Sequence, residues 1–363
     1  MIVNAYAILS LFACGLQCAV AMWLTGRWLN SRRVWSSGWT DGGAEAVERN
    51  AYLMMTLALV LLGLGLASWP LLYLLLQSYV PSWPGVMCID GVTRIGTGSL
   101  GASRFLPGLL TALQVFKPLL MLMGGAWLVI YLANRATSNA PLMRRLLWGL
   151  LIIGSTSLCD GVCTACYLLI PKQEDHLAAG CCTQATSTTT TRSSEPLLAG
   201  VSGTELAVVF MLLWAGLLIL ILDSIRKQRG GPKRMGGLLA STLVVSLLGG
   251  LFLVDVLSPA LLQRPHHCPY DLVSELPESV IGIVLFMVGS LWVAAGSIAS
   301  FCADVPETRE ILPGVQARVL FLGLFSYLGS FSLLSVQWCV LCTHRPPGGE
   351  AVWPSWSCWG CSR

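Results

Sequence analysis

The chain has 363 residues, of which 55% are hydrophobic and 11% charged, and its formal net charge at pH 7 is +4. Soluble proteins carry about 25% charged residues, so this composition excludes an ordinary soluble domain. The small positive charge requires no nucleic-acid partner, because the basic residues fall mainly in short segments between apolar runs. We therefore expect a multi-pass protein embedded in the lipid bilayer of a cell (inner or plasma) membrane.

Eight apolar runs are long enough to cross a hydrocarbon core of about 30 Å as helices. They predict an all-α, polytopic membrane bundle, since a helix satisfies its own backbone hydrogen bonds in lipid. We expect one transmembrane domain at 1–342, compatible with two halves at 1–171 and 201–342, and a Cys- and Trp-containing tail at 343–363. The runs cover 4–24, 51–79, 106–134, 146–171, 201–225, 235–257, 280–303 and 319–342.

The basic residues predict an orientation in the membrane. The loops after the first, third, fifth and seventh runs are richer in Arg and Lys than the loops between them, and the segment 226–234 reads RKQRGGPKR. Cytoplasmic loops carry such an excess of positive charge. Both chain ends are therefore expected on the extracytoplasmic side.

With this orientation, all four histidines and most of the cysteines fall on the extracytoplasmic side. An oxidising compartment permits disulfides, which would hold the short loops together. Mixed thiolate and imidazole ligands also suit zinc or copper. The candidate metal ligands are Cys88, Cys181, Cys182, His266, His267 and Cys268.

Two CxxC pairs, Cys163/Cys166 and Cys339/Cys342, lie near the outer ends of predicted helices and are candidates for thiol–disulfide exchange. A CxxC pair forms a reversible bridge when the pKa of one thiol is lowered. Together with Cys159, the first pair also follows one stripe of a helix, which fits a packing seam equally well. No CxxC is followed directly by His, so we expect no c-type haem.

Two ionisable residues, Lys117 and Asp160, fall inside apolar runs, where each costs about 2.5–3.5 kcal/mol on insertion scales. They lie at matching depth on sequential, antiparallel helices, which predicts a buried ion pair. Gln114, on the same helix face as Lys117, predicts a polar pocket there. The pair either fixes helix register, serves as a proton or ion relay, or anchors an anionic or quinone-like ligand. Asp255 is expected near a helix end, in contact with water.

Three classes of function remain open. The leading one is redox chemistry (thiol–disulfide or electron transfer) or soft-metal handling at the Cys/His-rich face, with other membrane or extracytoplasmic redox proteins as partners. The second is a permease that uses the Lys117–Asp160 pair. The third is a non-catalytic anchor subunit of a larger membrane complex. The sequence does not decide whether the protein is an enzyme, or which substrate or cofactor it uses.

Overall fold

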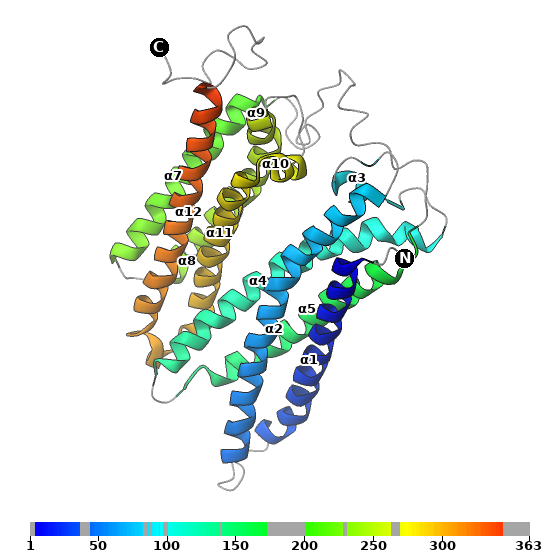
Figure 1. The fold of residues 1–363 in the computed structure, drawn as a ribbon. Coiled ribbons are helices and arrows are strands. Elements are labelled where there is room, and N and C mark those ends of the chain that lie inside the picture. The colour runs from blue at the N-terminus through cyan, green and yellow to red at the C-terminus, as the bar shows by residue number, and fades with distance from the viewer. Residues whose placement is uncertain are drawn as a thin grey trace. The chain divides into compact units, whose positions relative to one another are not determined.

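The computed structural model describes residues 4–36, 44–82, 86, 89–93, 95–96, 101–137, 140–172, 201–227, 231–262 and 269–343. These residues form helices and turns, with no strand among them (Figure 1). Eight helices are long and apolar enough to cross a membrane, which confirms the expected all-α polytopic bundle. The spans are Ala5–Asn30, Asn50–Ser82, Ala102–Arg135, Met143–Leu169, Gly203–Lys227, Lys233–Leu262, Pro277–Ala303 and Leu312–Gln337.

The chain divides into two compact units. The N-terminal unit is Met1–Cys182 with Cys302–Ile311, and the C-terminal unit is Thr183–Phe301 with Leu312–Arg363. The long helices of the N-terminal unit are α1 (Ala5–Ser36), α2 (Ala44–Tyr79), α4 (Leu106–Arg135) and α5 (Met143–Leu169), with the short α3 (Ile89–Thr93) between α2 and α4. The C-terminal unit contains α7 (Gly203–Lys227), α8 (Pro232–Phe252), α9 (Ser258–Leu262), α10 (Pro269–Glu275), α11 (Pro277–Ala303) and α12 (Leu312–Thr343).

Two glycines of α5, seven residues apart, hold α1 close to it in the N-terminal unit. A Cβ atom at Gly161 would lie 2.5 Å from Cys18 Sγ, and one at Gly154 would lie 2.8 Å from Thr25 Oγ1. Small residues allow helix backbones to approach closely in lipid. This close approach brings the polar side chain of Gln17 on α1 against the buried face of α5.

A glycine seam also joins α11 to α12 in the C-terminal unit. Gly282, Gly289 and Gly296 recur every seven residues, the period that keeps one helix face against a neighbour. A Cβ atom at Gly289 would lie 3.1 Å from the ring of Tyr327. The Tyr327 hydroxyl shares a 2.9 Å hydrogen bond with Ser290, so a polar contact lies beside the seam.

The expectation for Asp255 is wrong. This residue lies in a π-helical segment, Leu253–Leu257, and is 0% exposed. The apolar run continues through this segment into α9 and ends at Leu262, so Asp255 lies inside the span and not at its end. The hydrophobicity of the sequence does not indicate that Asp255 is buried in a π-helical turn, because the apolar pattern continues through this turn without a break.

Candidate functional site

The ion pair expected between Lys117 on α4 and Asp160 on α5 is present in the structure. Lys117 Nζ lies 3.2 Å from Asp160 Oδ2, and the two side chains are 3% and 1% exposed. Asp160 lies nine residues before the end of α5, and Lys117 eleven residues after the start of α4. At 1.5 Å per residue, the two residues lie about 14–17 Å from the end of α5 and the start of α4, which places both side chains near the middle of a bilayer core.

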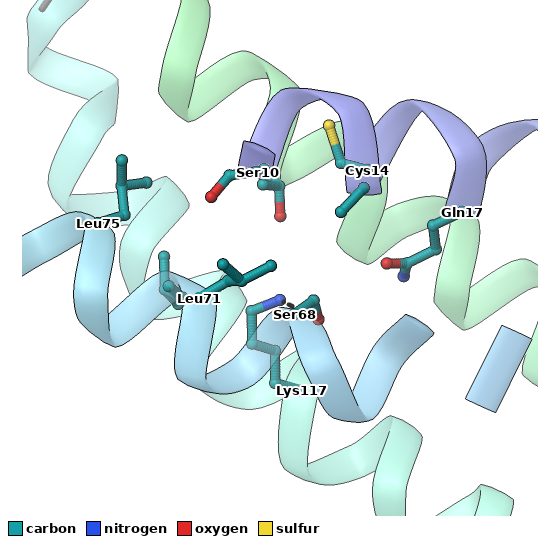
Figure 2. A pocket seen from close by; sticks show the side chains of 10 residues that line it. Ser10, Cys14, Gln17, Ser68, Leu71, Leu75 and Lys117 are labelled. Atoms are coloured by element: carbon teal, nitrogen blue, oxygen red, sulfur yellow. Dashed lines mark hydrogen bonds between the residues drawn. The ribbon is translucent and has the colours of Figure 1, made fainter. Parts of the chain in front are cut away.

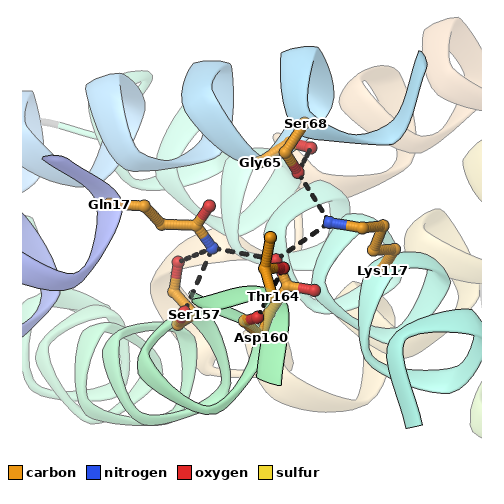
Figure 3. Close-up of polar contacts among 7 residues, drawn as sticks. All are labelled: Gln17, Gly65, Ser68, Lys117, Ser157, Asp160 and Thr164. Carbon is orange, nitrogen blue, oxygen red and sulfur yellow. Dashed lines mark hydrogen bonds and ion pairs between the residues drawn. The ribbon is translucent and has the colours of Figure 1, made fainter. Parts of the chain in front are cut away.

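Gln17 on α1 adds neutral donors to the pair. Its Nε2 lies 3.1 Å from Asp160 Oδ2, 3.0 Å from Ser157 Oγ and 3.0 Å from the Ser157 carbonyl oxygen (Figure 3). The amide therefore bridges the carboxylate and the α5 backbone one turn earlier. Gln17 is 1% exposed, so this contact is made away from water and lipid.

Ser68 on α2 completes the contacts of Lys117. Lys117 Nζ donates a 3.0 Å hydrogen bond to Ser68 Oγ, and that hydroxyl donates a 2.8 Å bond to the Gly65 carbonyl oxygen. Four helices thus supply five side chains, two of them from α5, to a continuous polar cluster, which we define as Gln17, Ser68, Lys117, Ser157 and Asp160 (Figure 3). Hydrogen bonds from several helices reduce the cost of keeping the two charges in a low-dielectric interior.

The cluster leaves one oxygen of the carboxylate unused. Asp160 Oδ1 is buried and makes no hydrogen bond to any residue that the structure describes, whereas Oδ2 accepts from both Lys117 and Gln17. A buried carboxylate oxygen without a donor costs free energy. Such an oxygen is available to accept a proton or a water molecule.

A small pocket lies against the cluster between α1 and α2 (Figure 2). The space open to the centre of a water molecule is about 10 Å³, close to the minimum that one water needs. Ser10 Oγ lines this pocket and is a second buried atom without a hydrogen-bond partner in the described part of the chain. The pocket residues are Ser10, Ala13, Cys14, Gln17, Ser68, Leu71, Leu72, Leu75, Lys117 and Thr164.

The pocket expected beside Lys117 and Gln114 is lined by Lys117 but not by Gln114, and most of its other polar groups come from α1 and α2. Gln17, Ser68 and Ser10 were not predicted as site residues. Gln17 is an amide within an otherwise apolar first span, and such a residue in a membrane helix is a signal for an interhelical hydrogen bond. The two serines carry no comparable signal, because serine is common in membrane helices as a small packing residue.

The cysteine candidates have different outcomes. Cys163 and Cys166 lie one turn apart on α5 as free thiols, half-buried and exposed respectively. Cys159 is also exposed, so the stripe of three cysteines is not a packing seam within the described bundle; α1 packs instead against the face with Gly154 and Gly161. Cys339 is a free, exposed thiol near the end of α12, and the side chain of Cys342 lies outside the described set.

All six candidate metal ligands lie outside the described residues: Cys88, Cys181, Cys182, His266, His267 and Cys268. Among the residues that are described, no three His, Cys, Asp or Glu side chains are grouped to hold a metal ion. Zinc or copper binding and a disulfide-stapled outer face therefore stay predictions from the sequence, as does the orientation that places these residues outside.

Lys172, just beyond the end of α5, is held by two tyrosines. Its Nζ donates a 2.8 Å hydrogen bond to the Tyr167 carbonyl oxygen and lies 4.8 Å and 5.3 Å from the ring centres of Tyr167 and Tyr79. Burial disfavours the charged amine and lowers the pKa of Lys172 from 10.5 to about 8. The unfolded chain binds more protons between these two values, so this residue makes the fold more stable as pH rises from about 8 to 10.5.

We expect acylation of the Lys172 amine to follow a titration near pH 8, because only the neutral amine reacts. The measurement is competitive acetylation across a pH series with peptide mass spectrometry. Lys227, whose side chain is 61% exposed, is the control in the same sample. Parallel pH profiles for the two lysines would contradict this assignment.

The fold and the cluster define the class of protein as a polytopic helical membrane protein with a buried, charged polar cluster. No family model, no curated protein and no solved structure matches the chain.

Proposed function

We propose that the protein is a permease in which the Lys117–Asp160 pair lines the path of a small charged species. The observation that supports this most is a buried ion pair whose Lys117 lines a pocket and whose carboxylate has one oxygen without a hydrogen-bond partner among the described residues. Ionisable side chains inside membrane spans are rare, and they mark ion and substrate pathways. We expect the Lys117–Asp160 pair to break and re-form as the charged species passes.

A pair that only fixes helix register would be expected to have all of its acceptors satisfied. Two features favour a site that changes state: Asp160 Oδ1 lacks a donor among the described residues, and so does Ser10 Oγ in the neighbouring pocket. Ser10 Oγ lines the pocket and gains a hydrogen bond when water enters it, and Asp160 Oδ1 gains one when water reaches the ion pair. Packing alone gives no reason to keep them polar.

The proposal is tested with the full chain in proteoliposomes on a solid-supported membrane. Steps in pH, sodium, potassium and phosphate are applied, and the current and the internal pH are recorded. We expect at least one step to give a signal that the Lys117→Met/Asp160→Leu variant lacks. Equal signals from the wild type, this variant and protein-free liposomes at every step would overturn the proposal.

A redox or soft-metal function at the outer face is the second candidate. Its support is the free state of the described CxxC cysteines, Cys163, Cys166 and Cys339, since free thiols are required for exchange or for soft-metal binding. Metal analysis and thiol titration of the purified protein test it. Absence of both bound metal and a titratable dithiol would exclude the redox or soft-metal function. A non-catalytic anchor role would then require a co-purifying partner.

A further inference from the structure

We propose that Asp160 is a proton-binding site that takes up a proton at Oδ1, and that this protonation releases Lys117, the member of the ion pair that lines the pocket between α1 and α2. The inference names the ion for the proposed permease and so rests on that function. The experiment below measures whether the pocket opens and does not depend on transport. The proton-binding proposal and the permease proposal can therefore fail separately.

The choice of atom follows from the hydrogen bonds of the carboxylate. Asp160 Oδ2 already accepts from Lys117 Nζ at 3.2 Å and from Gln17 Nε2 at 3.1 Å. Oδ1 is buried without a donor among the described residues. A proton added at Oδ1 therefore displaces no existing hydrogen bond, whereas one added at Oδ2 would face two donors.

The size of the pocket selects the ligand. Its free space holds about one water molecule, so a hydrated metal cation or an organic solute does not fit in this conformation. Lys117, Gln17 and Ser10 line it with donors and acceptors that one water needs. A proton carried by water is the charged species that this space admits.

The pocket extends from the polar cluster along α1 and α2 in one direction. On α1 its lining extends from Gln17 back to Ser10, and on the antiparallel α2 from Ser68 forward to Leu75, so both helices lead to the side where α1 begins. Seven residues on α1 correspond to about 10 Å of path. Leu75 at that end is 0% exposed, as are Leu24 and Leu61 in the opposite direction, so apolar side chains cover the polar site on both sides.

The step is a simple proton transfer. One O–H bond of a hydronium ion breaks, a new O–H bond forms at Asp160 Oδ1, and a neutral water is left. The net charge of the pair changes from zero to +1, because Lys117 keeps its proton.

The titratable groups around Asp160 in the described helices are Lys117 on α4, Cys14 and Cys18 on α1 and Cys163 on α5; α2 contributes the neutral Ser68. A buried cation that has lost its partner is unfavourable, so the pocket is expected to open to water.

Cys14 is a native reporter for this opening, since it lines the pocket and is 4% exposed. We compare its alkylation by N-ethylmaleimide in the wild type and in Asp160→Asn, which resembles the protonated acid. The full chain is used in phosphatidylcholine nanodiscs, and labelled peptides are resolved by mass spectrometry. We expect Cys14 to react several-fold faster in Asp160→Asn at neutral pH, with the ratio of the two rates approaching one in acid.

Taking the ratio of rates at each pH cancels the pH dependence of the thiol itself. Cys339, exposed in the C-terminal unit, is the internal control and should react equally in both proteins. If Asp160→Asn fails to fold, Lys117→Met/Asp160→Leu replaces it. Within each protein, the alkylation rate of Cys14 is then divided by that of Cys339. This quotient should rise in acid in the wild type but not in the double variant. The proposal would be overturned if the Asp160→Asn-to-wild-type ratio of Cys14 alkylation rates did not change with pH, or if sodium lowered that ratio at constant pH.

Discussion

Neutralising Lys117 alone or Asp160 alone is expected to destabilise the protein by about 3–5 kcal/mol, whereas neutralising both should cost far less. Each single change leaves the other charge buried without its partner, since the two side chains are 3% and 1% exposed. The single variants are Lys117→Met and Asp160→Leu, and the double variant combines them. Unfolding by SDS titration in mixed micelles gives the three free-energy differences and hence the coupling energy.

The control for this cycle is the surface pair of Lys227 and Asp223, whose side chains are 61% and 39% exposed and 2.9 Å apart. Exposed ion pairs contribute little to stability, because water screens them. Lys227→Met should therefore leave the unfolding free energy nearly unchanged. A double variant at the buried pair that is as unstable as the sum of the two single variants would show that the charges are not coupled.

Replacing Gly161 by Ala should separate α1 from α5 and weaken the polar cluster. The added Cβ atom would lie 2.5 Å from Cys18 Sγ and 3.4 Å from the Cys14 carbonyl oxygen, so the Cys18 side chain must move, and we expect α1 to shift with it. Overpacking of this kind costs about 1–3 kcal/mol. The shift also draws Gln17 away from Asp160, so we expect lower thermal stability together with faster alkylation of Cys14.

Two further variants distinguish this local conflict from a general effect of alanine. Gly15→Ala on α1 points into open space and should behave like the wild type. Cys18→Ala, combined with Gly161→Ala, removes the sulfur atom that the new methyl group meets and should restore most of the stability. Failure of this double variant to recover would mean that the α1–α5 contact is not limited by Cys18.

The fold was predictable because the bilayer imposes length and composition on each helix. The eight apolar runs correspond to the eight spans, yet several ends differ. The last span begins at Leu312 and not near 319, since Pro313, Gly314 and Gln316 interrupt hydrophobicity without interrupting the helix. Helix ends depend on capping and on packing against neighbours, and neither is visible in average hydrophobicity.

The ion pair was predictable because Lys117 and Asp160 each lie at a known depth, and sequential antiparallel helices are neighbours. The rest of the cluster was not, because it depends on which face of each helix turns inward. Gln17 meets Asp160 through the close α1–α5 contact at Gly154 and Gly161, a contact between segments 143 residues apart in the chain. Glycine spacing predicts a close approach but does not identify the partner helix.

The most direct test of a functional ion pair, as opposed to a structural one, exchanges its two charges. The Lys117→Asp/Asp160→Lys variant keeps a buried pair between α4 and α5 but moves the carboxylate away from Gln17 and Ser157. Currents from proteoliposomes of this variant are compared with those of the wild type, with unfolding measured on the same preparations. We predict a folded protein that has lost the current; a folded variant with the wild-type current would show that the pair serves only to hold the helices in register.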